Sequence, residues 1–134
     1  MKSTIRQEIV SHVNAAFVAQ FPGVPIVYDN QPFDWNNPPE TFVEFEVKFY
    51  GGHQISMSAT PKTRHTGYVY ATVYGKVGSG NKLILEIIDW MSSHLGYAQL
   101  ANTSISAPES DDLSGPVKNW YAEAVKFSFQ ADET

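Results

Sequence analysis

The sequence predicts an α+β fold in which two helices pack on one face of a mostly antiparallel sheet. Residues 3–20 and 81–95 carry apolar side chains at helical spacing. Three segments between residues 42 and 74, and a last segment at 120–130, alternate apolar and polar residues. Two amphipathic helices and an amphipathic sheet bury their apolar sides best against each other, which gives this architecture.

Length and composition limit the class of protein. The 134 residues, 43% of them hydrophobic, suit a single domain spanning 1–134 with one core. The net charge of −5 argues against nucleic-acid binding, which needs a basic face. With no cysteine, neither a disulfide nor a thiolate metal site can form. The apolar runs are too short to cross a membrane and there is no secretory signal, so we expect a soluble cytoplasmic protein.

The first part of the chain reads as a helix, a short strand and a loop. The helix, residues 3–20, has one apolar stripe made of Ile5, Ile9, Val13, Ala16 and Phe17. The segment Phe21-Pro22-Gly23 ends it, because proline cannot continue the helical hydrogen bonds. Residues 26–28 follow as a short strand, and the proline-rich segment 29–40 as a long loop.

A three-stranded meander is expected at the centre of the sheet. Its strands are 42–50, 54–60 and 68–74, joined by a turn at 51–53 and a polar loop at 61–67. A three-residue turn pairs Phe49 with Ile55 and keeps all apolar side chains on one face. The opposite face then carries Glu44, Glu46, Lys48, Ser56, Ser58, Tyr68, Tyr70, Thr72 and Tyr74.

The second half of the chain supplies the other helix and two strands. A glycine-rich loop, 75–80, leads to a helix that Asn81 caps and Gly96 closes after Leu95. A short strand at 104–107 precedes an acidic, turn-rich loop at 108–116. The last strand, 120–130, ends in a polar tail.

The residues do not form a recognisable catalytic or metal site. The glycine-rich loop lacks the spacing of either phosphate-binding motif. The histidines have no metal-ligand spacing, so we expect surface or capping roles for His12, His53, His65 and His94. Glu123 lies on the apolar face of its strand, either as an acid–base group or simply where the core stops. We therefore predict no enzymatic activity, no cofactor and no metal.

Several features together resemble the tail terminator family of long-tailed bacteriophages and prophages. They are the helix ending at Phe21-Pro22-Gly23, the segment Val27-Tyr28-Asp29-Asn30 with its proline-rich loop, the meander, the helix 81–95, and the final strand around 125–132. The resemblance covers nearly the whole chain and rests on pattern, without an invariant motif.

This resemblance implies a structural protein of the virion tail, assembled in the bacterial cytoplasm. Its subunits would form a hexameric ring on the end of the tail tube, stop tube growth and present a surface to head-completion proteins. No cofactor, membrane or specific nucleic-acid partner is implied. A related head–tail connector subunit is a neighbouring alternative. A different class of alternative is a small α+β enzyme or ligand-binding domain with a cavity between helices and sheet.

The polar face of the meander and its adjacent loop form the candidate subunit interface. Tyrosine is enriched at interfaces, because it buries a large area at low entropic cost and keeps a polar tip. The alternatives are that tyrosines simply form strands well, or that a helix covers this face. The candidate residues are Glu44, Glu46, Lys62, Arg64, His65, Tyr68, Tyr70 and Tyr74.

Overall fold

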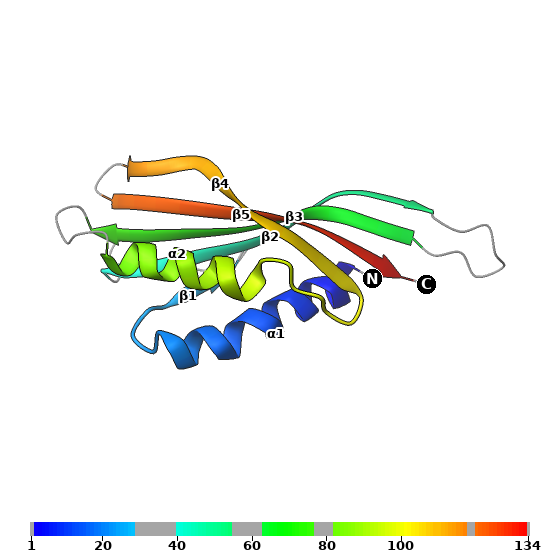
Figure 1. The fold of residues 1–134 in the computed structure, drawn as a ribbon, viewed down its shortest axis with the longest axis horizontal. Coiled ribbons are helices and arrows are strands. Elements are labelled where there is room, and N and C mark those ends of the chain that lie inside the picture. Colours follow the sequence, from blue (N-terminus) through cyan, green and yellow to red (C-terminus); the bar gives the residue numbers. More distant parts are fainter. Residues whose placement is uncertain (1, 29–39, 55–62, 77–81, 118–119, 134) are drawn as a thin grey trace.

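The computed structural model describes residues 2–28, 40–54, 63–76, 82–117 and 120–133. Five strands form one twisted sheet in the order β1-β2-β3-β5-β4, and both helices lie on one side of it (Figure 1). The predicted α+β fold is confirmed. In chain order the elements are α1 (Lys2–Gln20), β1 (Ile26–Tyr28), β2 (Thr41–Gln54), β3 (Thr63–Lys76), α2 (Lys82–Leu95), β4 (Thr103–Val117) and β5 (Trp120–Glu133).

The sheet is mostly antiparallel, as the sequence predicts. Only β1 runs parallel to its neighbour, with Ile26 opposite Val43 on β2. The pairs β2–β3, β3–β5 and β4–β5 are antiparallel. The connection through α2 leads from β3 to the edge strand β4, and β5 then returns between β4 and β3.

The predicted three-stranded meander is wrong. The chain does not turn at 51–53, because β2 continues to Gln54 and pairs with β3 over its whole length. Phe49 lies opposite Gly67 rather than Ile55, and Gly51 lies opposite Thr66. The register shifts between Phe49 and Gly51, which is a β-bulge that absorbs one residue without ending the strand. The rest of the predicted middle strand, 55–60, lies outside the described residues, as do residues 61 and 62 of the predicted loop.

The acidic segment 108–116 is also a strand rather than a loop. It belongs to β4, which extends to Val117 along β5. Two register irregularities interrupt this pairing, between Ile105 and Pro108 and between Ser110 and Ser114. β4 is an edge strand, where proline is tolerated because one side needs no hydrogen-bond donor. The expected polar tail likewise continues β5 to Glu133.

The core lies between the two helices and the sheet face that they cover, which we call the inner face. The buried stripe of α1 and that of α2 meet the alternating apolar residues of β2, β3 and β5. Burial of this surface stabilises the fold at roughly 25 cal/mol per Å² of apolar area. The main members are Ile5, Ile9, Val13, Phe17, Val43, Phe45, Val69, Val73, Ile84, Ile87, Met91, Leu95, Phe127 and Phe129. Within the described residues, no helix has both the length and the apolarity to span a membrane.

The end of α2 differs in detail from the expected glycine closure. The Gly96 amide still donates to the Ser92 carbonyl at 3.0 Å and so completes the last turn. The left-handed conformation that glycine usually takes is instead adopted by Tyr97, whose φ is 60°. Tyr97 is 73% exposed, so its side chain gains little from packing in return for the backbone strain.

Candidate subunit interface

The sheet face opposite the helices, which we call the outer face, carries the tyrosines that the sequence singles out. Both helices lie on the other side, so neither covers it (Figure 1). Strand alternation places the outward residues of three adjacent strands side by side, with Glu46 opposite Tyr70 and Tyr70 opposite Lys126. The residues are Glu44, Glu46, Lys48 and Tyr50 on β2, Tyr68, Tyr70, Thr72 and Tyr74 on β3, and Lys126, Ser128 and Gln130 on β5.

Three tyrosines on this face form one group, which we call the tyrosine cluster: Tyr50, Tyr68 and Tyr70. The rings of Tyr50 and Tyr68 meet edge to face with centroids 5.2 Å apart. Those of Tyr68 and Tyr70 are 6.0 Å apart, and the Tyr50 and Tyr70 hydroxyls hydrogen-bond at 3.3 Å. Tyr50 is 60% exposed, which leaves much aromatic surface open to a partner. The bulge in β2 makes Tyr50 the extra residue of its strand.

Two lysines flank the tyrosine cluster. The ammonium group of Lys48 lies 5.5 Å from the centroid of the Tyr70 ring, and that of Lys126 lies 5.3 Å from Tyr68. Both distances fit cation–π attraction. Lys48 also lies 3.5 Å from the carboxylate of Glu46. The cluster therefore has positive charge at its rim, although the chain as a whole is acidic.

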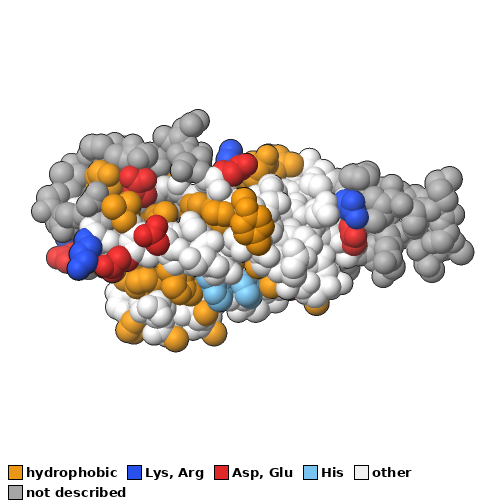
Figure 2. All heavy atoms as spheres, viewed as in Figure 1, with side chains coloured by type: hydrophobic (Ala, Val, Ile, Leu, Met, Phe, Trp, Pro, Cys, Tyr) orange, Lys and Arg blue, Asp and Glu red, His pale blue; other side chains and the backbone are white. Residues whose placement is uncertain are grey.

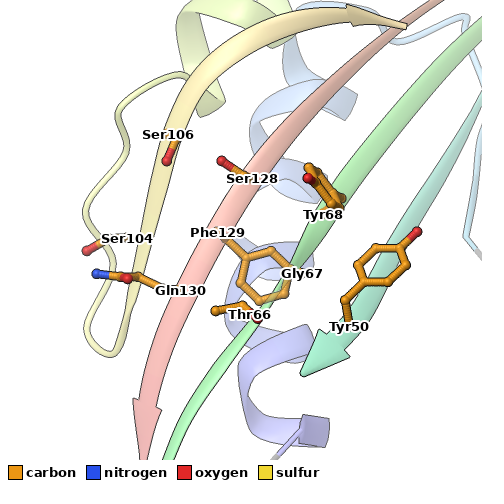
Figure 3. A pocket seen from close by; sticks show the side chains of 9 residues that line it. All are labelled: Tyr50, Thr66, Gly67, Tyr68, Ser104, Ser106, Ser128, Phe129 and Gln130. Atoms are coloured by element: carbon orange, nitrogen blue, oxygen red, sulfur yellow. The ribbon is translucent and has the colours of Figure 1, made fainter. Parts of the chain in front are cut away.

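A hollow of about 510 Å³ adjoins the cluster (Figure 3). Four strands contribute to it, and most of its polar groups are hydroxyls. Gly67 lines it on β3, where any added Cβ would strike the Lys48 carbonyl oxygen of β2. The surface thus combines exposed aromatic edges with hydrogen-bonding groups, as protein interfaces do. The lining residues are Tyr50, Thr66, Gly67, Tyr68, Ser104, Ser106, Ser128, Phe129 and Gln130.

The other end of the outer face is closed by contacts within the chain. Phe42 is 1% exposed and stacks on Tyr74, with ring centroids 4.9 Å apart. The Tyr74 hydroxyl donates to the Glu44 carboxylate at 3.3 Å. Burial, together with the charge of Glu44, raises the pKa of Tyr74 to about 12. Burial and the neighbouring Glu46 raise the pKa of Glu44. Tyr74 and Glu44 therefore belong to an internal network more than to an open surface.

The basic residues expected in a loop beside the face are placed differently. Residues 63–67 are the start of β3, so the loop prediction is wrong for them. Arg64 donates two hydrogen bonds to its own Asp132, at 2.8 and 3.1 Å. His65 points to the inner side and is 8% exposed, and this burial lowers its pKa. Lys62 lies outside the described residues.

Of the eight candidate residues, the structure therefore brings Tyr68 and Tyr70 together in an open cluster. It joins Glu44 to Tyr74, leaves Glu46 beside Lys48, and turns the side chain of His65 away from the face. Sequence reasoning omitted Tyr50 and Lys126 from the site. Alternation within their own strands assigns both to the outer face, but their neighbours depend on a register that the sequence did not reveal.

No acid–base or metal centre emerges from the described residues. Glu123 accepts a hydrogen bond from the Tyr121 hydroxyl at 3.1 Å and faces the inner side of β5 opposite Val73. Histidine, aspartate and glutamate side chains in the described part of the chain nowhere gather in threes that could hold a metal ion.

Comparison with known proteins shows the fold alone. No protein-family model matches the sequence, and no curated protein matches it. Solved structures do share the architecture. One of them superposes with a TM-score of 0.74 over 98% of this chain and 95% of that chain, at 11% sequence identity. Its name states no function.

Proposed function

We propose that this chain is a structural subunit of a phage or prophage tail, a tail terminator that forms a ring on the tail tube. The ring would be hexameric, stop tube growth and provide the surface for head joining. The observation that carries the proposal is the open tyrosine cluster on a sheet face that neither helix covers. This cluster supplies the self-association surface that a ring requires.

The composition of the cluster supports an interface over a plain solvated face. Solvated strand faces are usually rich in lysine, glutamate and threonine, whereas tyrosine is concentrated in the buried centres of interfaces. Tyr50, Tyr68 and Tyr70 are held by one another and by two lysines, so little side-chain freedom remains to be lost on association.

The alternative of an enzyme or ligand-binding domain places a cavity between helices and sheet. In the described residues that space is occupied by side chains such as Phe17, Phe45 and Phe127, each 0% exposed. Two pockets that described residues line are elsewhere: the hollow beside the tyrosine cluster, and a shallow site along α1 around Gln7. These positions favour a role through the molecular surface.

The test compares assembly of the wild-type chain with that of a Tyr68→Ala, Tyr70→Ala double variant. Light scattering measures the oligomeric state, and negative-stain microscopy with purified tail tubes measures capping. We expect the double variant to remain folded and to lose about 1–3 kcal/mol of association free energy for each central contact. The matched control is Tyr97→Gly, which removes an exposed tyrosine outside the cluster.

Two results would contradict the proposal. A wild-type chain that stays monomeric at high concentration and never decorates tail tubes would exclude the terminator role. Unchanged ring formation in the folded double variant would exclude the tyrosine cluster as the interface, while leaving the terminator role open to another surface.

A further inference from the structure

The two helices are joined by a pair of histidines that the proposed interface does not use. The ring of His12 on α1 and the ring of His94 on α2 stack with centroids 4.3 Å apart and planes 16° apart. Figure 2 shows histidine side chains next to each other on the surface between the helices. The sequence assigned the two residues to separate helices and gave no sign that they meet.

Each histidine hydrogen-bonds to the backbone of the other. His12 Nε2 lies 3.2 Å from the His94 carbonyl oxygen, and His94 Nε2 lies 2.7 Å from the His12 carbonyl oxygen. A carbonyl oxygen only accepts, so both Nε2 atoms carry a hydrogen. His94 is in the last turn of α2, where carbonyl groups lack a helical donor, so His12 also caps α2. We call this pair the histidine clasp.

The clasp continues into the apolar contact between the helices. The Trp90 ring stacks on His94 with centroids 4.7 Å apart and planes 11° apart. The other edge of Trp90 meets Phe17 and Phe21 of the α1 end, at 5.6 and 6.0 Å. A displacement of the clasp would therefore move Trp90 and loosen the packing of α1 on α2.

Charges around the clasp do not neutralise it. On α1 the nearest carboxylate one turn away is Glu8, which accepts hydrogen bonds from the Asn102 backbone and side chain at 3.0 and 3.5 Å. On α2 the acidic residues Glu86 and Asp89 are exposed. β3 and β5 present mostly apolar side chains to the helices, and the titratable groups described on that face are His65 and Glu123, the latter bonded to the Tyr121 hydroxyl. In the described part of the chain, no carboxylate bonds to either ring of the clasp.

We propose that the histidine clasp is an acid-sensitive latch that holds α1 against α2. With both rings neutral, the two Nε2–H groups are satisfied and the stack carries no charge. Protonation of both rings places two positive charges 4.3 Å apart, and no carboxylate of the described residues bonds to either ring, so the rings repel and the contact opens. The sheet, which carries the tyrosine cluster, remains formed while α1 loosens.

A double-mutant cycle at two pH values tests the latch. The variants are His12→Gln, His94→Gln and the pair together, because glutamine keeps a side-chain N–H donor and cannot be protonated in this range. Amide hydrogen exchange along α1, corrected for the intrinsic rate, measures opening. At pH 7.5 we expect a favourable coupling between the two histidines: together they should slow amide exchange along α1 about threefold more than their separate effects predict. At pH 5 we expect this coupling to change sign: together the two histidines should speed amide exchange along α1 about tenfold more than their separate effects predict. His53→Gln, a histidine on β2, is the control.

A coupling of the same sign and size at both pH values would overturn the latch and leave only a structural contact. If a glutamine variant does not fold, the wild-type chain provides the decision through its histidine ring protons. Titration of His12 and His94 in two linked steps, with loss of α1–α2 contacts at the second step, supports the latch. Independent titrations with all helix contacts retained at pH 5 overturn it. Assembly assays are a separate readout, so this result and the tail terminator proposal can fail independently.

Discussion

Replacement of Gly67 by alanine should be among the most damaging single-methyl changes in this chain. Gly67 is buried on β3, opposite the position where β2 bulges at Phe49. A Cβ built there meets the Lys48 carbonyl oxygen well inside van der Waals distance and two ring atoms of Phe129 at 2.9 Å. The ring of Phe129 can shift, but the backbone oxygen cannot move without separating β2 from β3.

The size of the effect follows from that distinction. Overpacking that side-chain movements can relieve costs about 1–3 kcal/mol of stability. Here the hydrogen-bonded pairing of β2 with β3 must also be distorted, so we expect Gly67→Ala to lower the free energy of unfolding by about 3 kcal/mol or more. That is a large share of the 5–15 kcal/mol by which domains are typically stable. It corresponds to a fall in Tm of roughly 10 °C for a domain of this size.

Urea unfolding of Gly67→Ala beside Gly51→Ala measures this prediction. Gly51 is on β2 of the same hairpin, and its added Cβ would meet Thr66 Oγ1 at an ordinary 3.4 Å. The control variant Gly51→Ala therefore measures the general effect of replacing a strand glycine by alanine, without a clash against the backbone. If the two variants unfold within about 1 kcal/mol of each other, the argument from the Lys48 oxygen is wrong.

Three further outcomes can be checked by stability and titration measurements. Tyr97→Gly should raise the thermal midpoint by relieving the left-handed strain, worth about 1 kcal/mol, and an unchanged midpoint would show that the strain is negligible. Glu44→Gln should stabilise the fold at pH 7, because the raised pKa of the Glu44 carboxyl means that folding disfavours its charged form. In the same variant an absorbance titration should show the pKa of Tyr74 falling from about 12, because the negative charge of Glu44 is gone. The lowered pKa of His65 means that stability should fall as the pH drops below about 6.5, and His65→Gln should flatten this dependence in acid unfolding curves.

Helical periodicity and strand alternation were sufficient to predict the elements that begin or end at recognisable residues, such as proline, glycine or a helix cap. The predictions for α1, β1, α2 and the body of β5 are confirmed, and so is the alternation that separates inner from outer residues on β2 and β3. These patterns reflect burial on one side, which acts on each element separately.

The central error came from reading glycines as a turn. Gly51 and Gly52 suit a tight turn as well as an irregularity inside a strand, and the local sequence does not distinguish the two. The choice depends on the partner strand, because β2 and β3 are each 14 residues long and their backbones stay paired past the bulge as far as Gln54 and Thr63. The loop predicted at 108–116 was wrong for a similar reason. Its turn-forming residues, Pro108 among them, lie in the edge strand β4, which accommodates them at shifts of register.

Contacts between distant elements could not be predicted at all. The contact of Lys126 with the tyrosine cluster requires β5 to lie next to β3, and the chain order alone permits several positions for the last strand. The histidine clasp joins residues on helices far apart in the sequence. Neither histidine is part of an apolar stripe, so no periodic signal marks it, and only the crossing of α1 with α2 makes the pair.

Neighbouring residues of one strand can affect different properties, because they lie on opposite faces of the sheet. On β5, Phe127 is 0% exposed in the core, whereas its neighbour Lys126 points outward over the Tyr68 ring. A change at the first position acts on the free energy of unfolding, because the cavity left behind cannot collapse. A change at the second alters the outer face, where the proposed interface lies. Since the helices cover only the inner face, selection for a partner could act on the outward residues around the tyrosine cluster without disturbing the core. An aromatic cluster with a basic rim is compatible with this arrangement.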